Sequence, residues 1–322
     1  MKLQTKISIK KQTENLIDYQ SKILLLGSCF SENIGNQLAY FKFNCKVNPF
    51  GILFHPKAIE NFITTTIAQK KITKEELIFN NERWHYLNAH SSLSGTNKEV
   101  ITSNLNTKLE HTYADLKTTS HIIITLGTAW VYRHLQTNEV VANCHKIPQK
   151  NFTKELLSIE TIYNSLQHVI NAIKTINKEV HVIFTVSPIR HVKDGFIENT
   201  RSKAHLISAI HKLTETNKKK VSYFPSYEIV MDELRDYRFY KEDMLHPNKT
   251  AINYIWEKFV ATWFTASSEK IMQTIDGIQK GISHKPFNAN SEQHQQFLKS
   301  LKKKITQVQQ EIPTINFNME QL

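Results

Sequence analysis

Short apolar runs alternate with segments of helical periodicity along most of the chain, from Lys22 to Phe264. The runs with the length of buried strands lie at 23–26, 41–47, 122–126, 180–186 and 221–224. Apolar residues three and four apart predict helices among them, including 31–39, 55–69 and 251–264. Because strands that are apolar throughout must be covered on both faces, this alternation predicts a parallel sheet in a three-layer αβα sandwich.

The pattern changes after Phe264. Residues 266–281 have helical periodicity, and a last helix carries an apolar stripe made of Phe297, Leu301, Ile305 and Val308. We therefore predict an α/β domain over residues 1–264 and a helical C-terminal extension over 265–322. The stripe needs a partner, and both packing against the α/β domain and self-association into a homo-oligomer are open. Residues 313–322 are predicted to form a frayed tail.

Two excursions, an insertion at about 71–120 and a loop at 134–152, exceed what a minimal sandwich needs. Long excursions in a compact domain are often lids or walls of a substrate site. The first carries His90 and the second carries His145. For each imidazole, a contact with substrate and a structural hydrogen bond are equally open interpretations.

The ends of the predicted strands bring small and polar residues to one edge of the sheet. Ligands of parallel α/β folds bind beyond these carboxyl ends. The residues that follow strands are Gly27, Gly51, Gly127 and Ser187. Arg190 lies just past Ser187, where a guanidinium would hold an anionic or carbonyl-bearing substrate. The alternative for Arg190 is an ion pair with Asp194 or Glu198.

The segment Gly27-Ser28-Cys29 has the form of a nucleophile site. An apolar strand ends at a glycine that permits a tight turn, and a segment that starts a helix follows. A cysteine in the first turn of a helix feels the helix amides, which favour the thiolate, so we expect a lowered pKa at Cys29. The alternative is a small buried apolar side chain.

A second motif, Asp243-x-x-His246-Pro247, precedes the helix at 251–264. Pro247 restricts the backbone of His246, and Asp243 can orient one ring nitrogen while the other faces a nucleophile. Two side chains that cap a helix are the alternative. The presence of both motifs, in this order and at the two ends of one α/β pattern, favours catalysis.

With these motifs the chain resembles the SGNH (GDSL-like) hydrolase superfamily, whose nucleophile follows the first strand and whose Asp-x-x-His lies near the end. Within it the chain resembles the GSCFA family, whose motif reads Gly27-Ser28-Cys29-Phe30-Ser31 here. Other stretches that resemble the family are Asn48–Ile52, Thr125–Trp130, Asn143–Lys146 and Ser187–His191. The resemblance covers about residues 20–262 and implies an SGNH-type, flavodoxin-like sandwich.

The resemblance also implies roles. The superfamily's Gly-Asp-Ser aligns on Gly27-Ser28-Cys29, which implies Cys29 as the nucleophile and a thioester intermediate. Ser28 stands in the position of the aspartate and remains the alternative nucleophile.

The superfamily's Gly-x-Asn reads Gly127-Thr128-Ala129 here, so the asparagine that helps to form the oxyanion hole is missing. The donors would then be the Thr128 hydroxyl, the amides of Cys29 and Gly51, or the side chain of Asn48.

Composition adds few constraints. The chain has 322 residues, of which 40% are apolar and 22% are charged, as in an ordinary globular protein. No apolar stretch reaches the about 18 residues of a membrane span, and the first residues lack the apolar core of a secretory signal. The three cysteines, Cys29, Cys45 and Cys144, have no metal-like spacing and indicate a reduced, cytoplasmic setting.

The formal net charge of +12 raises the question of nucleic acid. The densest basic runs, 218–220 and 302–304, are not interleaved with aromatic residues as base-stacking surfaces are. A solvated, lysine-rich surface explains the charge better.

We therefore interpret the chain as an SGNH-like hydrolase or acyltransferase that acts on an acyl group of a small-molecule or glycan substrate. Cys29 would attack the carbonyl, His246 would act as base and then as acid, and Asp243 would orient the imidazole. No metal and no cofactor are expected. The alternative is a catalytically silent domain of the same fold that binds a glycan or an acyl group.

Overall fold

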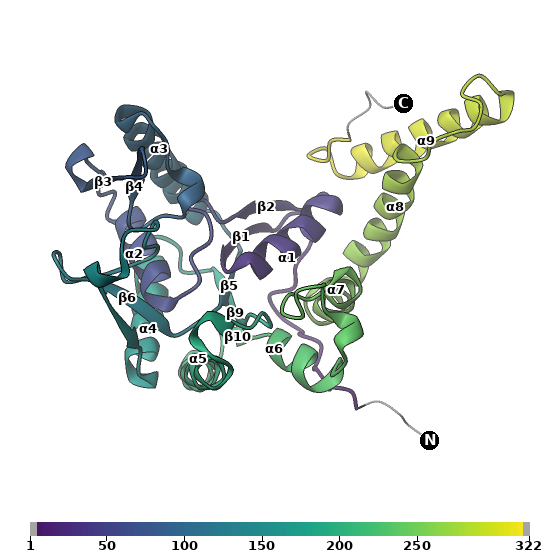
Figure 1. Ribbon diagram of the computed structural model, residues 1–322. Helices are drawn as coiled ribbons and strands as arrows, with labels where there is room; N and C mark the ends of the chain where they lie inside the picture. The colour runs from purple at the N-terminus through teal and green to yellow at the C-terminus, as the bar shows by residue number, and fades with distance from the viewer. Residues whose placement is uncertain (1–4, 318–322) are drawn as a thin grey trace.

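A five-stranded sheet forms the centre of the protein, with strand order β10-β9-β5-β1-β2 (Figure 1). The computed structural model describes residues 5–317. All neighbouring strands of this sheet are parallel, as predicted. Its strands are β1 (Lys22–Gly27), β2 (Asn44–Val47), β5 (His121–Leu126), β9 (His181–Val186) and β10 (Val221–Tyr223).

The strand order reverses direction next to β1. The chain passes from β1 to β2 on one side and then crosses to β5, β9 and β10 on the other. In open α/β sheets the loops on either side of such a switch point separate and leave a crevice at the carboxyl edge. The residues that follow β1 and β5 therefore lie on the two sides of this switch point.

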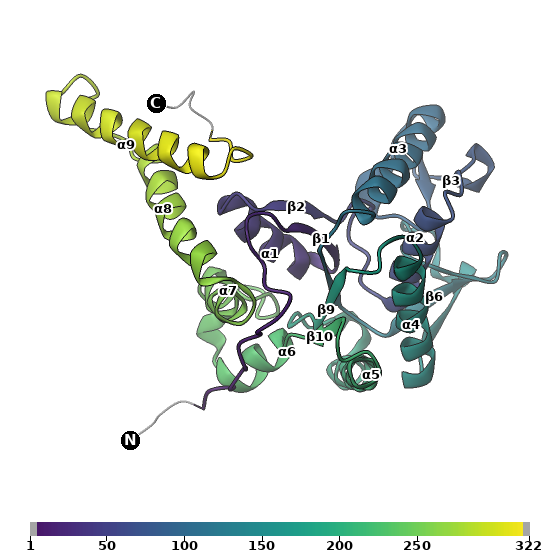
Figure 2. The ribbon, with the colours of Figure 1, turned by 180° about the vertical axis from the view of Figure 1, so that it is seen from behind.

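Helices cover both faces of the sheet and produce the predicted three layers (Figures 1 and 2). Leu24 and Leu26 of β1 pack on one side in a core that also includes residues of α2, α4 and α5. Ile23 and Leu25 point to the other side, toward α1 and α7. The helices are α1 (Cys29–Tyr40), α2 (Pro56–Ile67), α3 (Lys98–Leu116), α4 (Ile159–Ile176), α5 (Phe196–Thr216), α6 (Ser226–Glu228), α7 (Lys249–Trp263), α8 (Ala266–Ile282) and α9 (Glu292–Glu311).

The two excursions form small antiparallel sheets that the apolar pattern did not reveal. A two-stranded sheet consists of β3 (Leu77–Asn80) and β4 (Arg83–Tyr86). A three-stranded sheet has the order β7-β6-β8, with β6 (Trp130–His134), β7 (Glu139–Val141) and β8 (Phe152–Leu156). The single-turn elements are η1 (Lys74–Glu76), η2 (Ser91–Leu93), η3 (Gln149–Asn151), η4 (Val192–Asp194), η5 (Ile229–Glu233) and η6 (Tyr237–Phe239).

The predicted strand at 41–47 begins later than expected. Phe41 caps the C-terminus of α1, and Lys42 adopts a positive φ of 65° in the turn that follows. The apolar residue Phe43 packs beneath this turn against Tyr19, with 4.2 Å between ring centroids, so its hydrophobicity reflects the core and not a strand.

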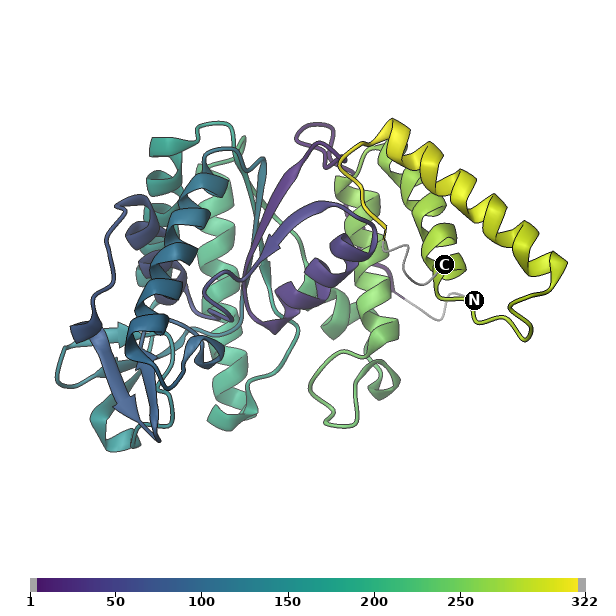
Figure 3. The same cartoon turned by 90° about the horizontal axis from the view of Figure 1, so that it is seen from above.

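The C-terminal helices α8 and α9 lie side by side at the end of the molecule away from β3 and β4 (Figure 3). Leu301, Ile305 and Val308 of the apolar stripe are buried in the same core as α1 and α7. The chain itself therefore covers most of the stripe, while Phe297 stays 38% exposed. The stripe does not require self-association, and the boundary between residues 264 and 265 remains a prediction.

The predicted frayed tail is wrong for residues 315–317. Ile315 and Phe317 are buried in the core of the C-terminal helices, and residues 318–322 lie outside the described part of the chain. None of the helices among residues 5–317 has both the length and the apolar composition needed to traverse a bilayer.

Candidate active site

The turn after β1 depends on Gly27. Its φ is 129°, and a Cβ at this position would lie 2.1 Å from the carbonyl oxygen of Thr125. Ser28 follows as the N-cap of α1, where its Oγ accepts a hydrogen bond of 3.3 Å from the amide of Phe30. The amide of Ser28 donates to the Thr125 carbonyl at 3.0 Å. Ser28 is only 2% exposed, so its hydroxyl is enclosed at the start of the helix.

Cys29 is the first residue of α1 and is only half-buried. Within residues 5–317, neither its backbone amide nor its Sγ has a hydrogen-bond partner elsewhere in the chain. Burial raises the pKa of the Cys29 thiol, and Glu32 adds to the increase. The Cys29 amide and the ammonium groups of Lys203 and Lys241 act in the opposite direction. The expected lowering of this pKa is therefore wrong, because burial outweighs the helix amides.

Asn48 lies beside the end of β1. Its Oδ1 accepts a hydrogen bond of 2.9 Å from the amide of Gly27, while its Nδ2 is buried and has no partner in the described chain. An unpaired buried amide group costs about 1–3 kcal/mol, so a free donor here requires an explanation. The amide of Gly51, expected as another donor, closes a turn by donating to the carbonyl of Asn48 at 2.8 Å. It is not free to bind an oxyanion.

The loop after β5 is also fully engaged. The amides of Gly127 and Thr128 both donate to the carbonyl of Phe54, at 2.7 and 3.2 Å. The Thr128 hydroxyl lies 3.0 Å from Oγ of Ser202 and accepts from the amide of Trp130. Because these groups are already paired, the position of the missing Gly-x-Asn supplies no free donor except through rearrangement of Thr128.

Asp243 and His246 form the predicted pair. His246 Nδ1 lies 2.6 Å from Oδ2 of Asp243, and the other carboxylate oxygen accepts from the amides of Leu245 and His246 at 2.9 Å. The amide of His246 and then that of Leu245 lower the pKa of Asp243 to about 2. The carboxylate therefore fixes the imidazole through one nitrogen, and the described chain gives Nε2 no hydrogen-bond partner.

The His246 loop and Cys29 belong to the same edge of the sheet. The amide of Lys241 donates to the His246 carbonyl at 2.8 Å, and the Lys241 ammonium lowers the pKa of the Cys29 thiol. Within the described residues, no hydrogen bond joins the thiol to the imidazole.

A cleft of about 580 Å³ opens at this edge beside Thr128, His191 and Leu245. Arg190 also lines it and donates to the Tyr240 hydroxyl at 2.8 Å and to the Met231 sulfur at 2.9 Å. The alternative of an ion pair for Arg190 is wrong, because no carboxylate in the described chain lies within salt-bridge distance of its guanidinium. Asp194 pairs instead with Lys154.

The two candidate histidines have structural hydrogen bonds. His90 caps η2 by accepting from the Ser92 amide at 3.2 Å, and its Cβ packs against Gly51. His145 lines the cleft, and its Nε2 lies 2.9 Å from the carbonyl of Tyr86. Burial lowers the pKa of His145 to about 4, so its imidazole is neutral near pH 7.

Two residues of this edge are not among the candidate site residues predicted from the sequence. His191 lies against Gly127 and Phe54, and burial lowers its pKa to about 4. Lys203 of α5 is buried with its Nζ on the carbonyls of Gly127 and Ser187. A signal for Lys203 was present, because it occupies the same helical face as Leu206, Ile210 and Leu213.

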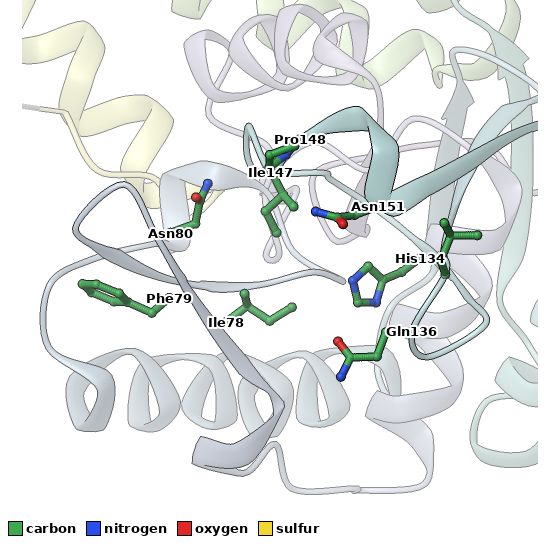
Figure 4. Close-up of a pocket in the computed structure, with 9 residues that line it drawn as sticks. Ile78, Phe79, Asn80, His134, Gln136, Ile147, Pro148 and Asn151 are labelled. Atoms are coloured by element: carbon green, nitrogen blue, oxygen red, sulfur yellow. The ribbon is translucent and has the colours of Figure 1, made fainter.

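A second pocket of about 670 Å³ lies between β3 and the β6–β8 sheet. Figure 4 shows His134, Gln136 and Asn151 on one side of it and the strand Ile78–Asn80 on the other. Ile147 lines both this pocket and the cleft. Across residues 5–317, no three His, Cys, Asp or Glu side chains are grouped in a way that would hold a metal ion.

Among solved structures the chain is similar to the acetyl xylan esterase Est2A from Butyrivibrio proteoclasticus. The identity is 10% and the TM-score 0.41 over 76% of this chain, which spans 64% of the length of that protein. It is also similar to a carbohydrate esterase family 3 protein from Talaromyces cellulolyticus, with 10% identity, a TM-score of 0.37 and coverage of 80% and 99% of the two chains.

The comparison with curated proteins gives no match. The sequence model of the GSCFA domain protein C-terminal domain matches residues 275–322. The model of the GSCFA family itself matches residues 22–259, which include both Cys29 and His246, and the chain therefore belongs to the GSCFA family.

Proposed function

We propose that this GSCFA protein hydrolyses or transfers an acyl group through a covalent intermediate on Cys29. The observation that carries the proposal is the contrast between the two neighbouring candidate nucleophiles. Ser28 is 2% exposed and caps α1, whereas Cys29 is half-buried with an unbonded Sγ at the start of the same helix. Its position next to the switch point between β1 and β5 supports a role in binding and chemistry.

The chemistry follows from the groups at this edge. His246 takes the proton of the Cys29 thiol, and the resulting thiolate attacks the acyl carbonyl. The imidazolium then gives this proton to the leaving alcohol or thiol as the thioester forms. His246 then removes a proton from water or from an acceptor alcohol, which attacks the thioester and regenerates the thiol. Asp243 holds the imidazole with the tautomer that this exchange requires. Catalytic contacts are often long without substrate and shorten when it binds.

Two donors support stabilisation of the oxyanion. The amide of Cys29 is at the first position of a helix, where the dipole favours negative charge. Asn48 Nδ2 is buried without a partner, and an oxyanion would satisfy it. We assign these two groups to the oxyanion hole and leave out Gly51 and Gly127, whose amides are already paired.

The linings of the cleft and the second pocket support an acylated glycan as substrate. Arg190 offers a guanidinium without a carboxylate partner to the polar end of the acyl group. Beyond Ile147, the second pocket presents the neutral amides of Asn80, Gln136 and Asn151 beside the 56% exposed ring of Phe79 (Figure 4). Amides pair with hydroxyl groups as both donors and acceptors, and an aromatic ring packs on the apolar face of a sugar.

The test is intact-mass spectrometry after incubation with a panel of activated esters, thioesters and acetylated oligosaccharides. We expect an acyl adduct on the parent protein and on Ser28→Ala, and none on Cys29→Ala. His246→Ala should slow adduct formation by roughly 10³-fold. An adduct that persists in Cys29→Ala and disappears in Ser28→Ala would make Ser28 the nucleophile and contradict the proposal. Thermal melts of each variant separate these outcomes from unfolding.

A second candidate function, ligand binding without turnover, is favoured by two observations. The amides of Gly127 and Thr128 are used by the Phe54 carbonyl, and burial raises the pKa of the Cys29 thiol. If the parent protein forms no adduct and releases no acyl product, yet acetylated oligosaccharide raises its melting temperature, this binding function replaces the catalytic one.

A further inference from the structure

Lys203 is a lysine inside the protein without a carboxylate partner. It is 1% exposed, and no carboxylate in the described chain lies within salt-bridge distance of its Nζ. The contrast is with Lys258, whose ammonium lies 2.9 Å from Glu233. Burying an unpaired charge costs several kcal/mol, so such residues are rare unless something in the fold uses the charge.

The Lys203 ammonium is fixed at the edge of the sheet that carries Cys29. Its Nζ donates to the carbonyl of Gly127 at 2.6 Å and to that of Ser187 at 2.8 Å, which tie it to the ends of β5 and β9. The amide of Ser28 donates to Thr125, two residues before Gly127. Lys203 and Cys29 therefore stand at adjacent strand ends, on the two sides of the switch point.

The charged groups around this pair have opposing effects. Burial and Glu32 of α1 raise the pKa of the Cys29 thiol, while its own backbone amide and the ammonium groups of Lys203 and Lys241 lower it. Burial lowers the pKa of Lys203 to about 7, Cys29 raises it and Arg190 lowers it further. His191 and the ring of Tyr227, 5.9 Å from Nζ, complete the surroundings.

We propose that Lys203 is a positioning residue for the reactive thiol: its ammonium, held by the Gly127 and Ser187 carbonyls, stabilises the thiolate of Cys29. No proton is transferred between the two groups in this role. The ammonium supplies a buried counter-charge to the half-buried thiolate, in addition to the ammonium of Lys241. The proposal deepens the proposed function and rests on it for the choice of Cys29 as the reacting group. Alkylation without substrate tests it separately from acyl transfer.

The experiment measures the rate of alkylation of each cysteine by iodoacetamide from pH 6 to pH 10, using peptide mapping of the full-length protein. We expect Lys203→Met to slow alkylation of Cys29 about tenfold below pH 7, where the parent lysine is charged. The difference should disappear toward pH 10, because the parent lysine is then neutral as well. A purely structural role for Lys203 gives no such dependence on pH.

Two further variants make the result decisive. Glu32→Gln removes an exposed carboxylate that raises the pKa of the Cys29 thiol, so it should speed alkylation of Cys29 by a factor of about two to three. Lys203→Arg keeps its charge at all pH values, so it should match the parent below pH 7 and exceed it above pH 8.

Cys45 is the internal control, since Lys203 is not among the groups that affect its pKa. Faster alkylation of Cys45 in Lys203→Met would indicate that this variant unfolds. In that case the pH profile of Cys29 alkylation in Lys203→Arg, compared with that of the parent, tests the proposal. Parallel profiles of Cys29 in the parent, Lys203→Met and Lys203→Arg would overturn the proposal, whether or not the protein forms acyl adducts.

Discussion

The amide of Gly27 donates a hydrogen bond of 2.9 Å to Oδ1 of Asn48. This bond joins the end of β1 to the turn after β2, and it occupies the oxygen of the Asn48 side-chain amide. Because Oδ1 is used, Nδ2 is the end left buried without a partner. One residue thus supports the backbone next to the candidate nucleophile and carries a donor that nothing in the described chain satisfies.

Asn48→Asp should separate these two roles. The substitution keeps an acceptor for Gly27 but replaces the donor with a carboxylate oxygen, which repels an oxyanion. We expect acyl-adduct formation to fall by about 10²–10³-fold, the usual cost of losing one oxyanion donor. The measurement is the rate of adduct formation per folded protein.

Asn177→Asp is the matched control. Asn177 is equally buried, but its Nδ2 donates to the carbonyls of Leu116 and Thr119, both at 2.8 Å. This variant should lower the melting temperature and leave adduct formation per folded protein unchanged. If Asn48→Asp forms the adduct as fast as the parent, Asn48 does not belong to the oxyanion hole.

Asp243→Asn should reduce acyl transfer without unfolding the protein. The amide keeps an oxygen for the backbone amides of Leu245 and His246 but removes the negative charge that stabilises the imidazolium of His246. We expect a loss of roughly 10²-fold or more in turnover and little change in melting temperature. Since the pKa of Asp243 is lowered to about 2, the parent carboxylate stays ionised and its activity should show no titration of this group above about pH 3.

Asp236→Asn is a suitable comparison for this prediction. Asp236 caps η6 in the same region by accepting from the Arg238 amide, and it has no histidine partner in the described chain. Its replacement should leave turnover within twofold of the parent. Equal losses in the two variants would mean that charge in this region, and not the Asp243–His246 pair, controls the rate.

The sequence predicts the central sheet and its functional edge because both follow from local signals. Continuous apolar runs such as Ile122–Leu126 identify buried parallel strands, and the carboxyl ends of parallel strands share one edge. The Asp243–His246 pair is equally local. Both partners, and the Leu245 and His246 amides that bind the carboxylate, lie within one turn of the chain. These features need no knowledge of distant contacts.

The features that the sequence does not reveal depend on contacts between distant segments. The raised pKa of Cys29 results from burial, which the position at a helix N-terminus does not indicate. The Phe54 carbonyl accepts hydrogen bonds from the amides of Gly127 and Thr128, which are distant from it in the sequence. The position of Lys203 on the apolar face of α5 is visible in the sequence, but its bonds to the Gly127 and Ser187 carbonyls depend on how α5 packs on the sheet.

Gly27→Ala and Gly277→Ala should have opposite effects on stability. Gly27 has a φ of 129°, and a Cβ would lie 2.1 Å from a backbone oxygen, so we expect a loss of about 3 kcal/mol or more from strain and steric overlap. Gly277 lies in α8 with no atom within 4 Å of the new Cβ, and alanine there should increase the free energy of unfolding by at most about 1 kcal/mol. Urea unfolding of both variants tests this, and a stable Gly27→Ala protein would mean that the turn after β1 adopts another backbone conformation.

The stability of the protein should rise with pH above neutrality through Lys203. Burial lowers the pKa of this lysine from its ordinary 10.5 to about 7, so between these values the unfolded chain binds more protons than the folded one. The free energy of unfolding therefore increases with pH across this window and is lower below pH 7, where the charged lysine must be buried.

Lys203→Met lacks this dependence, although it also loses the bonds to Gly127 and Ser187. The loss of these bonds lowers the stability of the variant by the same amount at every pH. The test is therefore how the difference in unfolding free energy between parent and variant changes from pH 6.5 to pH 9.5. We expect the parent to gain on the variant by a few kcal/mol over this range in urea titrations. A difference that stays flat would show that the buried lysine keeps its ordinary pKa.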